Sequence, residues 1–252
     1  MCYDNEAQPP VPPGAIGSAH SEEVVLTAAD GNRFAAYVAY PDQPSGSTAQ
    51  IIIYPDVRGL FQFYKDLALR FAEVGVTALA LDYFGRTAGL GERDEALDFW
   101  PHVQQLSLES FTLDVKAAQT YLQEKGGKDS AIFVVGFCMG GSFALLTGTN
   151  PDFGFAGLIA FYAGMSRNFG GNGTVLDHAE KVVYPVLGLF GGADQGIPQS
   201  DVQQLDEKLD VAGVPHTIVV YPGATHSFFD RRATEFAEAS ADAWQRVLDF
   251  IR

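Results

Sequence analysis

The sequence predicts a three-layer α/β domain, with a mostly parallel central sheet, an N-terminal antiparallel hairpin and helices on both faces of the sheet. From residue 50 onward, short unbroken apolar runs alternate with helix-length amphipathic segments. Such runs are typical of parallel strands that are covered on both faces. The 252 residues, of which 47% are hydrophobic, are enough for one well-buried domain.

The N-terminal part of the chain is expected to contain an arm and a hairpin. Residues 1–20 are rich in proline and polar residues and predict a flexible arm, followed by a single domain over 21–252. Within residues 22–41, two strand-like runs meet at Asp30-Gly31, a dipeptide that strongly favours a hairpin turn.

The remaining elements follow in alternation. The predicted strands are "QIIIYP", "VTALALDY", "AIFVVGF", "AGLIAFYA", "YPVLGLFG" and "HTIVVYP", and the predicted helices cover 63–75, 108–126, 200–213 and 235–251. In the second of these helices, Phe111, Val115, Ala118 and Leu122 form one apolar stripe at helical spacing. Gly75, Gly126 and Gly213 stand where helix C-caps are expected.

Composition excludes several classes of partner. The net charge of −15 argues against nucleic acid and anionic membrane surfaces, although local arginines could still bind an anionic substrate. The two cysteines, Cys2 and Cys138, do not suggest a disulfide framework. No signal peptide and no membrane-spanning run is readable, so a cytoplasmic protein is expected, with a monomer favoured.

Ligands of parallel α/β sheets lie beyond the carboxyl ends of the strands, which directs attention to Cys138. This residue follows an apolar run in Gly136-Phe137-Cys138-Met139-Gly140 and precedes a helix-compatible stretch. A side chain between glycines at a tight strand-to-helix turn projects into the site, and the helix start favours a thiolate there. A buried cysteine on a glycine-rich turn is the competing explanation.

Two later residues favour the interpretation of Cys138 as a nucleophile. Asp194 follows one predicted strand in "FGGADQGIP", and His226 follows the next in "YPGATHSFFD". A nucleophile needs a base, and the base needs a group that fixes its tautomer. Nucleophile, acid and histidine therefore occur in an order known for catalytic triads, each just past a strand, and we interpret Cys138, Asp194 and His226 as a triad.

No metal-ligand spacing and no phosphate-binding motif is present, so neither a metal nor a cofactor is expected.

Over most of residues 22–252 the sequence resembles the dienelactone hydrolases (carboxymethylenebutenolidases), members of the α/β-hydrolase superfamily. The resemblance rests on "GFCMGG", "GGADQGIP", "GATHSF" and "LDYFGR". It implies an α/β-hydrolase fold and a cysteine that opens a small cyclic enol-lactone through a thioester. It also implies an oxyanion hole from the backbone amides of Val57 and Met139. Asp56 stands where the family has a glutamate that holds the resting thiol.

The family's substrate carboxylate is bound by two arginines. By resemblance, Arg86 in "FGR" is the first of them. The position of the second is occupied by Asp230, so Arg231, Arg232 or Arg58 is the expected substitute.

Residues 87–107 follow a strand end and can overhang the pocket, where Phe99 and Trp100 would form an apolar wall. The expected activity is hydrolysis of small lactones or activated esters, with a dienelactone-like substrate. Two alternatives stay open: an acyltransferase that uses the same cysteine, and a small-molecule-binding relative without turnover.

Overall fold

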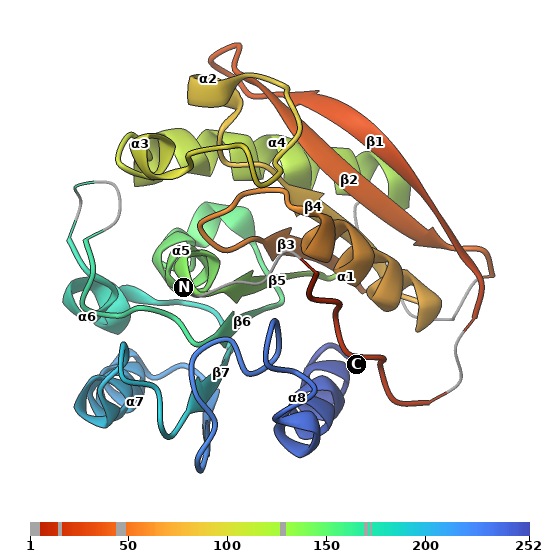
Figure 1. Cartoon of the computed structure of the whole chain (residues 1–252). Coiled ribbons are helices and arrows are strands. Elements are labelled where there is room, and N and C mark those ends of the chain that lie inside the picture. The colour runs from red at the N-terminus through yellow and green to blue at the C-terminus, as the bar shows by residue number, and fades with distance from the viewer. Residues whose placement is uncertain (1–5, 15–16, 44–48, 127–129, 169–170, 172) are drawn as a thin grey trace.

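One sheet, with strand order β1-β2-β4-β3-β5-β6-β7-β8, runs through the molecule (Figure 1). The computed structural model describes residues 6–14, 17–43, 49–126, 130–168, 171 and 173–252. The strands are β1 (Ala19–Thr27), β2 (Arg33–Pro41), β3 (Gln50–Tyr54), β4 (Thr77–Leu81), β5 (Ile132–Phe137), β6 (Gly157–Phe161), β7 (Val186–Gly191) and β8 (His216–Tyr221). Every strand predicted from the sequence is therefore present.

The pairing of the strands confirms the predicted fold class. β1 and β2 form the expected antiparallel hairpin, in which Thr27 pairs with Arg33 across a turn that contains Gly31 at φ 86°. β2 also pairs antiparallel with β4, whereas all pairs from β3 to β8 are parallel. The carboxyl ends of the parallel strands consequently share one edge of the sheet, where the candidate site residues lie.

Helices form the outer layers (Figure 1). The α-helices are α1 (Gln62–Glu73), α2 (Gly85–Ala88), α3 (Trp100–Val103), α4 (Leu108–Gly126), α5 (Met139–Thr147), α6 (Val175–His178), α7 (Gln199–Ala212) and α8 (Ala237–Phe250), and the 3₁₀ turns are η1 (Pro151–Phe153) and η2 (Ala179–Lys181). α1 meets α8 through the rings of Phe71 and Trp244, at 4.8 Å between centroids. α4, α5, α6 and α7 form a second contiguous group, as expected of a three-layer α/β fold.

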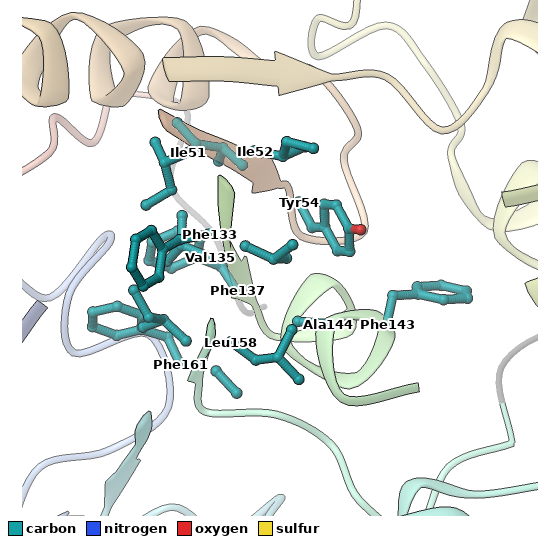
Figure 2. Packing of buried hydrophobic residues seen from close by; sticks show 14 of the residues in the cluster. Ile51, Ile52, Tyr54, Phe133, Val135, Phe137, Phe143, Ala144, Leu158 and Phe161 are labelled. Atoms are coloured by element: carbon teal, nitrogen blue, oxygen red, sulfur yellow. The ribbon is translucent and has the colours of Figure 1, made fainter. Parts of the chain in front are cut away.

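Buried side chains on β5 and on the neighbouring strand β3 make the core contacts with the two helical layers. Phe133, Val135 and Phe137 share one face of the strand, and Figure 2 shows Phe133 and Phe161 on the side away from α5. Phe137 stacks on Phe161, with ring centroids 4.7 Å apart. On the opposite side, Tyr54 lies toward α5 in Figure 2 and meets Phe111 of α4 edge to face. This aromatic packing holds the strand ends that carry the site in fixed positions.

The N-terminal segment, expected from the sequence to be a flexible arm over 1–20, is described only in part, since residues 1–5, with Cys2, and 15–16 lie outside the described residues. Pro9 and Pro12 are buried, and the indole N–H of Trp244 on α8 donates to the carbonyl oxygen of Pro10 at 2.8 Å. β1 already begins at Ala19. Residues 6–14 therefore lie against the domain, because the polyproline stretch offers carbonyl oxygens and apolar rings to α8.

Across the described part of the chain, no helix combines the length and the apolar character that crossing a membrane requires.

Candidate active site

Cys138 lies on a sharp turn between β5 and α5. Its backbone angles are φ 55° and ψ −112°, in the region that disfavours side chains, and its N–H donates to the carbonyl oxygen of Phe161 at 3.0 Å. The flanking glycines are required by close approach of backbone. A Cβ on Gly136 would overlap the carbonyl oxygen of Gly140, and a Cβ on Gly140 would overlap those of Tyr54 and Pro55. The glycine pattern read from the sequence therefore has a steric cause.

The start of α5 supplies hydrogen-bond donors beside the thiol. Cys138 is the N-cap residue of this nine-residue helix, and the N–H of Ser142 closes the first turn onto the Cys138 carbonyl at 3.2 Å. The amides of the residues between them, beginning with Met139, belong to the first turn, whose N–H groups have no acceptor within the helix. Together with the helix dipole, they favour negative charge at this end of α5.

Asp194 and His226 come together from the loops after β7 and β8. His226 Nδ1 lies 2.6 Å from Asp194 Oδ2, while Asp194 Oδ1 accepts from the backbone N–H of Gly196 at 2.8 Å. The Asp194 side chain is almost completely buried, and the imidazole is 20% exposed. His226 Nε2 is buried and has no hydrogen-bond partner within the described part of the chain. The carboxylate thus engages one ring nitrogen and leaves the other available to a reacting group.

A cavity of about 390 Å³ joins these groups. Cys138, Asp194 and His226 all line it, as do Val57 and Met139, the residues expected to form an oxyanion hole. Its remaining lining residues are Gly164, Arg167, Ala193, Gln195, Gly196, Ile197, Thr225, Arg231 and Arg232. The volume is within the range of small-molecule sites.

Backbone strain is concentrated around this cavity. Among the described residues other than glycine, positive φ values occur at Cys138 (55°), Tyr162 (36°) and Ser227 (60°). These residues follow β5, β6 and β8 at the carboxyl edge of the sheet, and the Tyr162 ring lies 5.0 Å from that of His226. Such conformations persist only where the surrounding structure holds them, and they gather at functional sites.

Asp56 and Arg58 form a buried ionic cluster with Asp230. Arg58 Nε lies 3.1 Å from each oxygen of Asp56, and its Nη2 donates to Asp56 Oδ2 and to Asp230 Oδ2, each at 2.7 Å. We call this Asp56–Arg58–Asp230 arrangement the Arg58 bridge. None of its three members is among the residues that line the cavity. Both Asp56 oxygens are engaged by Arg58, which does not favour the expected contact of Asp56 with the thiol, and Arg58 is committed to two carboxylates.

Two further predicted binding residues lie away from the cavity. Arg86 forms an ion pair with Asp30 and donates through Nη2 to Asp114 Oδ1 at 2.8 Å. These acids neutralise the guanidinium that was expected to bind a substrate carboxylate. Trp100, at the start of α3, is 49% exposed and does not line the cavity, although Phe99 beside it is buried. The structure therefore does not bring Arg86 or Trp100 to Cys138.

Three other arginines line the cavity instead. Arg232 donates to Thr225 Oγ1 at 2.7 Å and pairs with Glu235. Arg167 and Arg231 are exposed and form no ion pair with the described residues. Arg231 and Arg232 were among the substitutes weighed from the sequence, but Arg167 was not. Its only sequence signal is its position shortly after the β6 run, in the loop that follows a parallel strand.

The described residues contain no group of three or more histidine, cysteine, aspartate or glutamate side chains suited to hold a metal ion.

Comparison with known proteins relates the whole arrangement to one family. The model of the family described as "Dienelactone hydrolase family" matches residues 34–252. A protein of Methylorubrum extorquens named "Putative carboxymethylenebutenolidase" is 31% identical over 231 residues, covering 86% of this chain and 76% of that protein. A Yersinia pestis protein of the same name is 29% identical over 230 residues, covering 88% and 84%. A crystal structure from Klebsiella pneumoniae subsp. pneumoniae, titled as a putative dienelactone hydrolase, superposes with a TM-score of 0.81 at 27% identity, covering 93% of this chain and 99% of that one.

Proposed function

Because the chain belongs to the dienelactone hydrolase family, we propose that it opens small lactones or cleaves activated carboxylic esters through Cys138, His226 and Asp194. The observation that carries the proposal is the 2.6 Å contact of His226 with Asp194, on the cavity that Cys138 also lines. In this proposal His226 Nε2 takes the thiol proton, and the thiolate attacks the ester carbonyl carbon.

The start of α5 and the loop after β3 supply the electrostatic part of the mechanism. The negative charge that develops on the carbonyl oxygen is stabilised by the backbone N–H groups of Met139 and Val57, which line the same cavity. The tetrahedral intermediate collapses to a thioester, and the imidazolium of His226 gives its proton to the leaving oxygen. In a lactone, that oxygen stays attached to the acyl group.

Water completes the cycle. His226 takes a proton from the water that attacks the thioester carbonyl, and the returning proton releases Cys138 as the thiol. Asp194 holds the imidazole with Nδ1 protonated and stabilises its positive charge. Asp56 has no part in this scheme, since Arg58 engages both of its oxygens. A reduced thiol is required throughout, which agrees with our proposal of a cytoplasmic location.

Substrate charge is a separate part of the proposal. Arg167 and Arg231 line the cavity and form no ion pair with the described residues, although Arg231 also interacts electrostatically with Asp230. We assign them, rather than Arg86, as anchors of an anionic substituent on the ester or lactone, because Arg86 is paired with Asp30. Neutral aryl esters need no such anchor and are the first substrates to try.

The test is detection of the acyl adduct on Cys138. Incubation with an activated aryl ester should add the acyl mass to the protein, and the adduct should decay in water as free acid appears. Cys138→Ala should form no adduct and lose turnover, because alanine fits the turn but supplies no nucleophile. Turnover at the wild-type rate in Cys138→Ala would refute the assignment. Decay of the adduct only with an added alcohol or amine would indicate an acyltransferase, and absence of an adduct with every ester would indicate a binding protein.

The roles of His226 and Asp194 are tested by comparing the loss of kcat in their variants with the loss of folded protein. His226→Ala and Asp194→Asn should lower kcat by about 10²–10⁴-fold, because the first removes the base and the second leaves the imidazole in the wrong tautomer or orientation. Circular dichroism and the melting temperature check that the fold persists. Activity that falls only in proportion to the folded fraction would make both residues structural.

A further inference from the structure

The turn that carries His226 has a strained conformation. Ser227, directly after the imidazole, has φ 60°, and the following residues fold back through hydrogen bonds from the N–H groups of Asp230 and Arg232 to the Ser227 carbonyl oxygen, at 3.1 and 3.3 Å. A positive φ outside glycine is strained and is stabilised only by its surroundings. Contacts from outside the turn must therefore contribute to holding it.

Arg58 provides such a contact from a distant part of the chain. It lies in the loop between β3 and α1, directly after Val57, and it binds Asp230 across 172 residues of sequence. Its own loop is held by the same guanidinium, because Nε and Nη2 both donate to Asp56, which precedes Val57. One side chain consequently connects the segment of the proposed oxyanion amide to the segment of the proposed base.

The chemistry of the cluster suits a geometric role better than a stabilising one. The side chains of Arg58, Asp56 and Asp230 are 3%, 7% and 2% exposed, and two carboxylates share one cation. Buried ion pairs gain little net stability, since desolvation offsets much of the Coulomb attraction. The planar guanidinium, in contrast, fixes the directions of both acids, which a lysine cannot do.

Arg58 also interacts electrostatically with further buried polar groups, the phenols of Tyr64 and Tyr162. The hydroxyls of Tyr64 and Tyr162, and Oδ1 of Asp230, are buried without a hydrogen-bond partner among the described residues. Tyr162 is itself strained and its ring contacts that of His226. The bridge is therefore continuous with the wall of the site, although it does not line the cavity.

We propose that the Arg58 bridge positions the backbone amide of Val57 and the imidazole of His226 relative to each other, with Arg58 and Asp230 as positioning residues. This inference rests on the function proposed above. Its consequence is specific, because the two groups it aligns act on the transition state. Loss of the alignment lowers kcat while substrate binding, and hence KM, changes little.

Asp230→Ala is the principal test, since it breaks the connection to the His226 turn and leaves Asp56 and Arg58 as a balanced pair. We expect kcat to fall about 10- to 100-fold, as for displacements near 1 Å in an active site, with KM within about threefold of the wild-type value. Asp230→Asn is the matched control, because the amide oxygen can still accept from Arg58 Nη2, and it should retain most of kcat. Arg58→Lys should resemble Asp230→Ala, since a point charge cannot fix both acids.

Asp114→Ala controls for the loss of any buried carboxylate that is paired with an arginine. Asp114 pairs with Arg86 and does not line the cavity, so this variant should lower the melting temperature without lowering kcat.

The rate of Cys138 alkylation by iodoacetamide gives a readout without substrate. This rate should fall in Asp230→Ala, because the imidazole that assists the thiol moves in that variant, and it should not fall in Asp230→Asn.

Three outcomes would overturn the proposal. They are a kcat within about twofold of wild type in Asp230→Ala, equal losses in the alanine and asparagine variants, and a loss in Asp114→Ala as large as in Asp230→Ala. Failure of the proposed function is distinguishable, because it would be seen as turnover that persists in Cys138→Ala or as absence of an acyl adduct in the wild type, whereas failure of the bridge proposal is seen in the Asp230 variants alone.

Discussion

Asp230 combines a positioning role with an unusual proton affinity. Burial raises the pKa of its carboxyl group from 3.8 to about 7, the charge of Asp56 adds to the effect, and Arg58 opposes it. The titratable and charged groups that face it are Arg58, Asp56, Arg231 and the phenols of Tyr64 and Tyr162, whose own pKa values are raised by burial. Asp230 therefore holds its proton to a higher pH than an ordinary aspartate does.

This pKa predicts how stability changes with pH. Between pH 4 and 7 the folded protein keeps a proton that the unfolded chain has lost, so the contribution of Asp230 to the free energy of unfolding decreases as pH rises through this window. Asp230→Asn removes this dependence. Urea unfolding at pH 5 and pH 8 should show the variant gaining stability relative to wild type at the higher pH. An equal difference at both values would contradict the raised pKa.

For single residues, the sequence predicted the candidate site side chains that directly follow strands, but it did not predict the ion pairs of the arginines. Cys138, Asp194 and His226 could be singled out because strand ends are readable from apolar runs. The partners of Arg86 and Arg58 could not, since Asp114 and Asp230 are 28 and 172 residues away in sequence. Such pairs depend on how helices and loops pack over the sheet, which local pattern does not encode.

Among the elements, α5 and the loop after β3 approach each other closely, backbone against backbone. Gly140, in the first turn of α5, leaves room for the carbonyl groups of Tyr54 and Pro55, just before Asp56 and Val57. The approach of this helix therefore sets where the backbone amide of Val57, our proposed second oxyanion donor, can lie. Helix, strand and turn types were predictable here from periodicity and glycine spacing, but the contact itself was not.

Gly140→Ala should test this interlock. The added methyl group overlaps backbone atoms that cannot rotate away, so we expect a loss of about 1–3 kcal/mol in the free energy of unfolding, together with a large loss of kcat. Gly91→Ala is the matched control, because its Cβ would make only an ordinary contact with Arg93, and it should change neither quantity much. If Gly140→Ala kept both its stability and its kcat, the loop after β3 could move without affecting folding or turnover, and the close approach of α5 would not matter.

Over the whole molecule, the net charge of −15 opposes the approach of an anion, so any anionic substrate depends on the arginines at the cavity. The sequence predicted that local cations would be needed and named Arg86 first. The structure supplies Arg167, Arg231 and Arg232 there, from loops after β6 and β8. Sequence position alone could not separate the arginines that face the cavity from those that acids neutralise.

Substrate selectivity should therefore follow the cavity arginines. The double variant Arg167→Met with Arg231→Met should lower the ratio of kcat/KM for carboxylate-bearing to neutral esters by about three- to tenfold, and added salt should lower the same ratio in the wild type. Arg86→Met should leave the ratio unchanged, because its guanidinium binds Asp30 and Asp114. If only Arg86→Met moved the ratio, the anchor predicted from the sequence would be right and the cavity assignment wrong.

The 172-residue span of the Arg58 bridge has a consequence for the order of events in folding. Val57, Cys138, Asp194 and His226 come from loops that follow four different strands, and the last of them, β8, joins the sheet at an edge. Contacts of such long sequence separation form late, because the entropy of closing the intervening chain is lost before they are made. Cys138 and His226 can thus meet only after the edge strand β8 has docked. Until that strand has docked, Cys138 lacks the histidine that we propose as its base.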